Sequence, residues 1–311
     1  MAESRSNSAF LRLGTRGSPL ALFQANLVRD LLCSAHGWEP GRVAIEVIRT
    51  TGDRIQDRPL ADAGGKGLFT KEIEEALSAG AIDLAVHSSK DMPTVLPPGL
   101  ILTACPERED ARDAFISRKA LSIAGLARGA TVGTASLRRA AMAKRLRPDL
   151  VVVPLRGTVE TRLRRLQEGV ADATFLACAG LKRLGLQDAA TAILDIDEFL
   201  PAVGQGAIGI EVRESDSRTR ERLAAIDHAP TSTALVCERA FLAVLDGSCR
   251  TPIGGHAVVA GGRTIMPRKR MRPDGSEAFE TTREGAVADA AALGADAGAE
   301  LKRRGGADFF N

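Results

Sequence analysis

The chain has 311 residues, of which 44% are apolar and 26% charged, and this composition is typical of a large globular protein with a substantial core. The net charge is only +3 and aromatic side chains are scarce, which argues against a nucleic-acid partner that would need a strong basic field or stacking rings. Apolar runs are too short for a membrane span, and the first ten residues lack the apolar core of a secretory signal. We therefore expect a cytoplasmic protein with no membrane contact.

Cysteine and histidine are too dispersed to suggest a metal site. The five cysteines are far apart with no C-x-x-C pair, and the four histidines form no cluster. This pattern excludes the usual zinc spacing and a disulfide framework, and it favours a reducing compartment.

The first hundred residues alternate between strand and helix patterns. Segment 10–14 predicts a strand, and Ser18 followed by Pro19 predicts a helix start, because serine caps a helix and proline fits its first turn. The next expected elements are a strand over 43–50, a helix over 70–79 and a strand over 82–87. Such alternation predicts a parallel sheet in an α/β domain.

A second series of the same kind follows. It comprises expected strands over 113–117, 130–134, 151–155 and 172–177, and expected helices over 136–146 and 158–168. Segments 105–112 and 200–206 are polar or rich in proline and glycine, and we interpret both as crossings between two α/β lobes. A chain that crosses twice would form a cleft with a two-stranded hinge.

The pattern changes after residue 216 and predicts a smaller α+β domain. Its expected parts are helices over 217–227 and 231–245, a glycine-rich loop over 246–255, strands over 256–260 and 277–282, and a helix over 285–304. The expected domains are a first lobe (1–106 and 207–226), a second lobe (107–206) and a C-terminal domain (227–311).

Two basic turns lead from predicted strands or loops into helices. Gly64, Gly65, Lys66 and Gly67 run directly into a helix, where backbone N–H groups and the helix dipole favour an anion. A tight turn with a solvated lysine is an equally open interpretation. The other turn holds Arg16, for which an exposed arginine beside a helix cap is the simpler interpretation.

Segment 138–165 carries nine basic residues against two acidic ones. Arg138 and Arg139 open a helix, Arg156 is on a turn, and Arg162 lies in the following helix. Arginine suits carboxylates and phosphates because its fork donates two parallel hydrogen bonds, and α/β lobes bind ligands at such turns. A solvated helix face explains Lys144, Arg145, Arg164 and Arg165 better than it explains the arginines on the turns.

The segment from His87 to Asp91 follows an apolar strand at the mouth of the inferred cleft. Asp91 is either a functional carboxylate or a cap of the next turn, and we interpret His87 as a packed histidine. Cys249, in the glycine-rich loop, is the one cysteine expected to be exposed, which makes it a candidate nucleophile. The cysteines at 33, 105, 178 and 237 fit apolar packing patterns.

Long collinear motifs resemble those of the porphobilinogen deaminases, also called hydroxymethylbilane synthases. They include LGTRGSPLAL, GGKGLFTKEIE, DLAVHSSKDMP, EREDARDAF, VGTASLRR, LRGTVETRL, LACAGLKRLGL, LPAVGQGAIGIE and GSCRTPIG, and cover most of residues 10–255. The resemblance implies two lobes like those of periplasmic binding proteins and a third domain. It also implies a monomeric transferase of tetrapyrrole biosynthesis that deaminates four porphobilinogens and joins them head to tail.

The resemblance further implies a dipyrromethane cofactor bound through a thioether to Cys249. It makes Asp91 the catalytic aspartate, which stabilises positive charge on pyrrole nitrogens. The arginines implied to hold substrate or cofactor carboxylates are Arg16, Arg138, Arg139, Arg156, Arg162 and Arg183. Further contacting positions are Lys66, Lys90, Ser18, Ser88, Thr134 and Ser136, while Gln205 serves the hinge; no metal or nucleotide is implied.

Two departures from the family pattern stand out. Asp62 replaces a lysine that often precedes the glycine loop, so we expect it to face solvent or pair with a cation. Segment 265–272 reads IMPRKRMR where the family has an alternating apolar strand, and Pro267 should weaken that strand.

Two other functions compete with this hypothesis. A non-catalytic two-lobed binder of small anionic ligands would use the cleft and the arginines but would need neither Asp91 nor Cys249. An RNA binder would use the basic run at 138–165, and the lack of aromatic residues in that run disfavours it.

Overall fold

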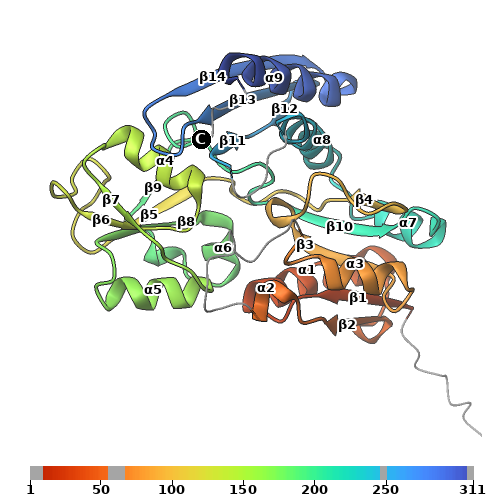
Figure 1. The fold of residues 1–311 in the computed structure, drawn as a ribbon. Coiled ribbons are helices and arrows are strands. Elements are labelled where there is room, and N and C mark those ends of the chain that lie inside the picture. Colours follow the sequence, from red (N-terminus) through yellow and green to blue (C-terminus); the bar gives the residue numbers. More distant parts are fainter. Residues whose placement is uncertain (1–9, 55–66, 246–250, 307–311) are drawn as a thin grey trace, which may run out of the picture. The chain divides into compact units, whose positions relative to one another are not determined.

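The computed structural model describes residues 10–54, 67–245 and 251–306 (Figure 1). Contacts divide the chain into two compact units, Met1–Glu107 with Ile208–Ala229 and Arg108–Ala207 with Pro230–Asn311. The chain thus leaves the first unit after Glu107 and returns to it at Ile208.

The first unit is built on a five-stranded sheet in the order β2-β1-β3-β10-β4. Its strands are β1 (Leu11–Thr15), β2 (Val43–Val47), β3 (Leu84–Ser88), β4 (Leu100–Ala104) and β10 (Ile208–Arg213). Its helices are α1 (Pro19–His36), the short α2 (Thr51–Arg54), α3 (Lys71–Ser78) and α7 (Ser217–Ala224). Helix α1 packs on β1, β2 and β3, whereas α3 packs on β1, β3 and β10.

Helix α1 begins and ends where its sequence directs. The Ser18 hydroxyl accepts a hydrogen bond from the Ala21 N–H at 3.3 Å, and Pro19 occupies the first turn, as predicted. The helix stops at Gly37, whose φ of 64° closes it with a hydrogen bond from its N–H to the Cys33 carbonyl.

The second unit contains a sheet of the same plan, in the order β7-β6-β8-β5-β9. Its strands are β5 (Asp113–Ser117), β6 (Thr131–Gly133), β7 (Val151–Val153), β8 (Ala173–Ala177) and β9 (Ala192–Ile193). Its helices are α4 (Leu137–Leu146), α5 (Val159–Gln167) and α6 (Cys178–Arg183).

Both sheets are mixed: β1 pairs in parallel with β2 and β3, and β6 with β7 and β8, as the alternation predicted, but the remaining pairs are antiparallel. In each sheet the fourth strand, β10 or β5, runs antiparallel to both of its neighbours. These are the strands that directly follow the two predicted crossing segments. A strand that arrives from the other unit has no helical crossover behind it, so nothing forces it to run parallel.

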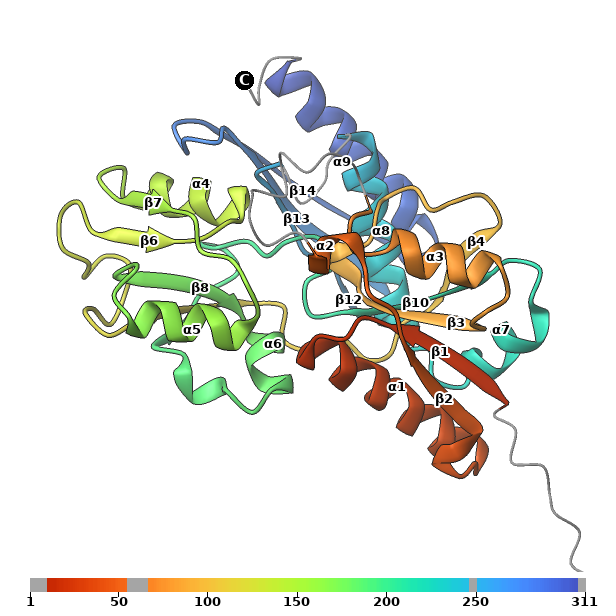
Figure 2. The same cartoon turned by 60° about the horizontal axis from the view of Figure 1, so that its bottom comes forward.

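The second unit also holds a four-stranded antiparallel sheet at its C-terminal end (Figure 2). Its strands are β11 (Ile253–Gly255), β12 (Val258–Ala260), β13 (Arg263–Met271) and β14 (Ala278–Ala286). Helices α8 (Ala229–Val244) and α9 (Ala290–Gly305) share its apolar core. The two five-stranded sheets and this α+β region confirm the predicted fold class. The last helix starts at 290 rather than 285, because β14 continues to Ala286 beside β13.

Strand β13 forms despite its proline, so the predicted weakness of segment 265–272 is not seen in its pairing. Pro267 lacks an N–H, but its carbonyl accepts from His256, which is in the short gap between β11 and β12. N and O of one residue point to the same side in an antiparallel strand, so the missing donor also falls at that gap. The strand therefore loses little of its hydrogen bonding.

Candidate functional site

A small cavity opens in the first unit beyond the ends of β1 and β3, and polar side chains dominate its wall. Its volume is about 60 Å³. The polar residues that line it are Arg16, Ser18, Gln24, Thr70, His87, Ser88 and Asp91. Four of these, Arg16, Ser18, Ser88 and Asp91, are predicted site residues, and the structure brings them together.

The basic residue of this cavity, Arg16, stacks on an aromatic ring. The Arg16 guanidinium lies over the Phe69 ring, 4.1 Å from its centre. Such stacking orients the planar fork of the guanidinium. Phe69 was not predicted as a site residue, although it lies only two residues after the glycine loop in the sequence.

The acidic side of the cavity comes from a single 3-10 turn, Ser89–Asp91, at the end of β3. Lys90 and Asp91 are both half-buried there. Ser88 is fixed by Gln24 of α1, whose side-chain amide donates to the serine hydroxyl at 2.9 Å. Strand and turn thus place a carboxylate, a hydroxyl and a guanidinium around one space.

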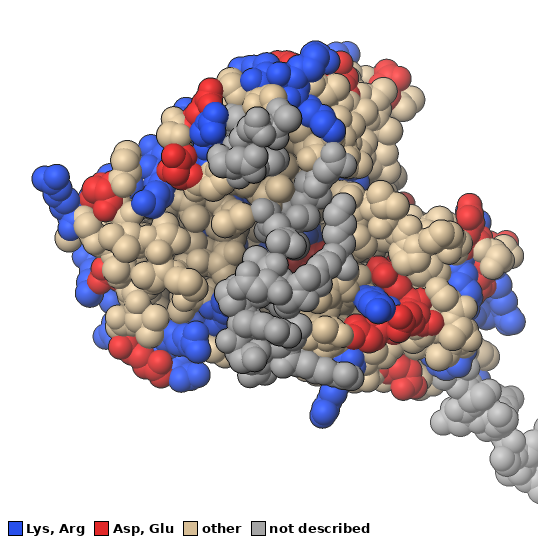
Figure 3. Space-filling model, viewed as in Figure 1, with Lys and Arg blue, Asp and Glu red and all other residues tan. Residues whose placement is uncertain are grey.

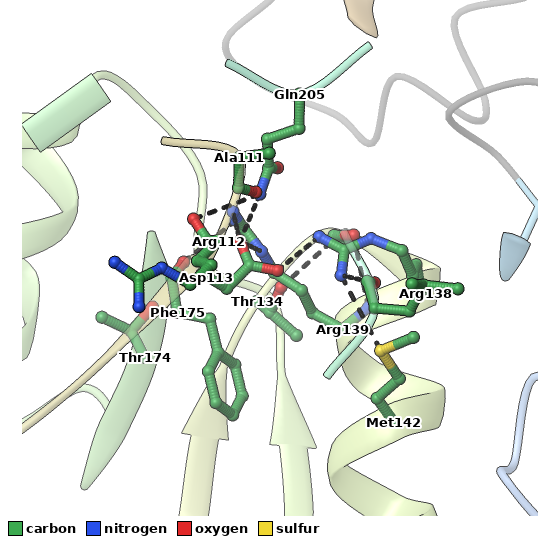
Figure 4. Close-up of polar contacts among 12 residues, drawn as sticks. Ala111, Arg112, Asp113, Thr134, Arg138, Arg139, Met142, Thr174, Phe175 and Gln205 are labelled. Carbon is green, nitrogen blue, oxygen red and sulfur yellow. Dashed lines mark hydrogen bonds and ion pairs between the residues drawn. The ribbon is translucent and has the colours of Figure 1, made fainter. Parts of the chain in front are cut away.

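In the second unit, Arg138 and Arg139 are buried and converge on Asp113 (Figure 4). Arg138 Nη2 lies 2.7 Å from Asp113 Oδ2, and Arg139 Nη2 lies 2.6 Å from Oδ1. Each guanidinium also donates to a backbone carbonyl, Arg138 to Leu200 and Arg139 to Phe175. The role of both arginines toward a ligand stays a prediction, while their pairing with Asp113 was not foreseen.

The charges of this cluster do not cancel, since two guanidiniums face one carboxylate. Burial alone would raise the pKa of Asp113, but the two guanidiniums outweigh it and hold that pKa well below its ordinary value. Burial lowers the pKa of Arg138. One net positive charge therefore remains in a region where an ionic group is costly.

The remaining predicted residues of the second lobe lie at the ends of its strands. Thr134 is buried after β6, and its hydroxyl accepts from the Ser136 N–H at 3.1 Å. Ser136 in turn caps α4. Arg156 and Arg162 are half-buried on the β7–α5 turn and in α5, and Arg162 Nε donates to the Gly157 carbonyl at 2.9 Å.

Gln205 joins the two crossing segments. Its side-chain amide donates to the Ala111 carbonyl at 2.7 Å and to Asp113 Oδ1 at 3.0 Å. Arg183, also buried, donates to the carbonyl of Gly206 at 2.8 Å. Two predicted residues, one for the hinge and one for binding, thus hold the same stretch of backbone.

Five residues named in the sequence analysis, Asp62, Gly64, Gly65, Lys66 and Cys249, lie outside the described residues. The other four cysteines are buried, as their packing patterns predicted, and they form no disulfide with one another. Within the described segments, no helix has the length and apolar character needed to cross a membrane. On the face drawn in Figure 3, basic and acidic side chains are interspersed over the described residues.

Two family models match the chain. Residues 11–221 match "Porphobilinogen deaminase, dipyromethane cofactor binding domain", and residues 232–303 match "Porphobilinogen deaminase, C-terminal domain". A porphobilinogen deaminase of Nitrobacter hamburgensis is 62% identical over 310 residues, which are 100% of this chain and 98% of that protein. One of Paracoccus denitrificans is 53% identical over 301 residues, or 97% and 96% of the two chains.

Among solved structures, a periplasmic substrate-binding protein of an ABC transporter from Coxiella burnetii is similar with a TM-score of 0.42 and 15% identity. The match covers 70% of this chain and 91% of that one, and a likeness this slight supports no conclusion about ligand or activity. The family models and the curated relatives, in contrast, span nearly the whole sequence. The chain belongs to the porphobilinogen deaminase family.

Proposed function

We propose that Asp91 is the catalytic carboxylate of this chain and that Cys249 carries its dipyrromethane cofactor. As a member of its family, the chain is a hydroxymethylbilane synthase (EC 2.5.1.61) with a dipyrromethane-binding domain, and it works in tetrapyrrole biosynthesis. The observation that supports the role of Asp91 is its place in one small cavity with Arg16, Ser18 and Ser88.

The residues around this cavity fit a dipyrromethane. Such a group carries acidic side arms and pyrrole N–H donors, so it needs cations and hydroxyls for the former and an acceptor for the latter. Arg16 with Ser18 supplies the first kind of contact, and Asp91 supplies the second. At about 60 Å³ the cavity takes only part of the group, because sites that enclose a whole ligand are roughly 300–1,000 Å³. When bound, the cofactor supplies the free ring carbon to which the first substrate is joined.

Asp91 stabilises positive charge where it develops. As the amino group of porphobilinogen leaves as ammonia, the pyrrole nitrogen becomes cationic, and a fixed carboxylate close to that nitrogen lowers the barrier. Gln24 holds Ser88 at the end of β3, three residues before the carboxylate.

Arginine side chains hold the acidic side arms in both lobes. Arg16 does so in the first lobe, and Arg156 and Arg162 do so from the β7–α5 region of the second. Arg138 and Arg139 act from the N-terminal turn of α4, where their shared net positive charge favours a further carboxylate. The same proposal covers Lys66, Lys90, Thr134, Ser136 and Arg183 as contacts, and Gln205 as the hinge link.

We also propose a three-domain division (1–106 with 207–226, 107–206, and 227–311) and a monomeric, cytoplasmic enzyme. Four buried cysteines that form no disulfide with one another suit a reducing compartment.

Intact mass and turnover together test the two central roles. We expect purified Cys249→Ser to have the mass of the bare chain, whereas wild type and Asp91→Asn are heavier by one dipyrromethane. Asp91→Asn should keep that mass and its thermal stability but lose at least about 100-fold in turnover, the size of effect of losing a key electrostatic group. Exposed Asp188→Asn is the matched control and should match wild type.

A wild-type rate in Asp91→Asn would refute its role. An active wild type that carries no extra mass would refute the role of Cys249.

A further inference from the structure

A buried histidine and a buried glutamate lie behind the wall of the Asp91 cavity. His87 Nε2 is 3.4 Å from Glu211 Oε2, and the two residues are 5% and 0% exposed. Among the described residues, neither Glu211 oxygen accepts a hydrogen bond, and His87 Nε2 has no hydrogen-bond partner either. A buried carboxylate without donors is costly, so this pair needs a physical explanation.

The strand pairing of the first unit brings His87 and Glu211 together. His87 follows Ala85 by two residues on β3, so both face α3, where Ala85 packs with Ile73 and Leu77. On β10, Gly209 pairs with His87, and Glu211 is the next residue on the same face. A diagonal cross-strand contact thus places the carboxylate beside the ring.

Glu74 of α3 covers the same face and adds a second acid. Burial raises the pKa of Glu74, and the charge of Glu211 adds to that rise. Asp91 and Arg16 are the charged groups on the cavity side of His87. The histidine therefore has acidic neighbours on both sides.

His87 also lines the cavity itself, together with Asp91. One residue thus lines the proposed reaction space and lies 3.4 Å from a carboxylate that accepts no hydrogen bond from the described residues. This is the arrangement of a base whose charged form is stabilised by an acid behind it.

We propose that His87, with Glu211 as its charge partner, accepts the proton that is released when two pyrrole rings are joined. The inference rests on the proposed function. Joining the rings forms one C–C bond between the free ring carbon and the methylene carbon of porphobilinogen, and the protonated amino group leaves as ammonia with the electron pair of its C–N bond. The attacking ring carbon loses its hydrogen as a proton, and the C–H electron pair returns to the ring. His87 takes that proton as a neutral imidazole, then passes it to ammonia, which departs as ammonium.

The test uses the full-length holoenzyme and porphobilinogen carrying deuterium at its free ring carbon. Intact mass after rapid quenching measures the gain of each substrate unit in wild type, His87→Gln and Glu211→Gln. His256→Gln is the matched control, because His256 is another buried histidine beside a buried glutamate, 3.7 Å from Glu238.

In His87→Gln we expect the step that follows the first addition to slow by about 100-fold or more, the size of a lost acid–base group, and to show a deuterium isotope effect. Cofactor mass and thermal stability should be retained. In Glu211→Gln the acid limb of the kcat/KM profile should move to lower pH, because the imidazolium has lost its negative partner. The NMR titration of the His87 ring should move in the same direction.

His87→Gln at the wild-type rate without an isotope effect would overturn the inference, and so would an unmoved acid limb and ring titration in Glu211→Gln. If His87→Gln does not fold, Glu211→Gln decides. A wild-type rate in His87→Gln alone overturns the proton-accepting role of His87 and Glu211 but leaves the role of Asp91 intact. A wild-type rate in Asp91→Asn also removes the proposed function.

Discussion

Replacing Asp113 by asparagine would leave Arg138 and Arg139 buried without a negative partner. The carboxylate accepts hydrogen bonds from both guanidiniums and from the Gln205 amide, and it is 0% exposed. Asparagine has nearly the same shape but only one acceptor oxygen, and its NH2 group would face donors. The substitution therefore removes charge and acceptors while it leaves the packing nearly intact.

The expected loss of stability follows from breaking a buried ion pair on one side. Such changes cost about 3–5 kcal/mol, because the remaining charge is left uncompensated. In a domain of 150–250 residues each kcal/mol shifts Tm by roughly 2–4 °C, so Tm should fall by about 6–20 °C. The cost should lie in the second unit, to which all of these residues belong.

Thermal and urea unfolding of the purified chain measure this effect. Asp149→Asn is the control, because Asp149 pairs with Arg147 in a partly exposed bridge, and we expect little change there. The double variant Asp113→Asn/Arg139→Met removes one of the two uncompensated cations and should recover part of the lost stability. A change below about 1 kcal/mol in Asp113→Asn would refute the reasoning.

Two further outcomes follow from the same region. Because the folded pKa of Asp113 is depressed, its contribution to stability is full above the unfolded pKa of about 3.9 and is lost as pH falls toward the folded pKa. The stabilities of wild type and Asp113→Asn should therefore converge at low pH in acid unfolding experiments. A stability difference that stays constant with pH would contradict this. Gly206→Ala should lower Tm, since Gly206 has a φ of +85° and an added Cβ would lie 2.3 Å from the Glu109 carbonyl oxygen, a cost of at least about 1 kcal/mol; an unchanged melting curve would show that the backbone yields there.

Local signals in the sequence predicted most of the separate elements. Strand β5 lies at 113–117 as predicted, and α4 begins at Leu137 after its serine cap. These elements are set by hydrophobic period and capping, which a short window contains. Strands β4 and β10 were not predicted, and the antiparallel direction of β5 and β10 could not be, because their neighbours come from distant parts of the chain.

In the candidate site, too, some residues were predicted from local motifs while their partners in space were not. The residues around Asp91 follow from motifs and from the rule that ligands bind at strand ends. The partners of those residues do not: Asp113 looks like the ordinary start of an apolar strand, and Glu211 like one polar residue in another. Only the pairing of strands far apart in sequence places these acids beside Arg138 and His87.

The late return of the chain to the first unit has a consequence for biosynthesis of the protein. Strand β10 lies between β3 and β4, so both edges stay unpaired until residues 208–213 have been translated. The N-terminal lobe must wait on the ribosome until the whole intervening lobe has emerged. A nascent chain arrested before that point would expose two open β-edges, which are natural binding sites for chaperones and equally for other unfinished chains.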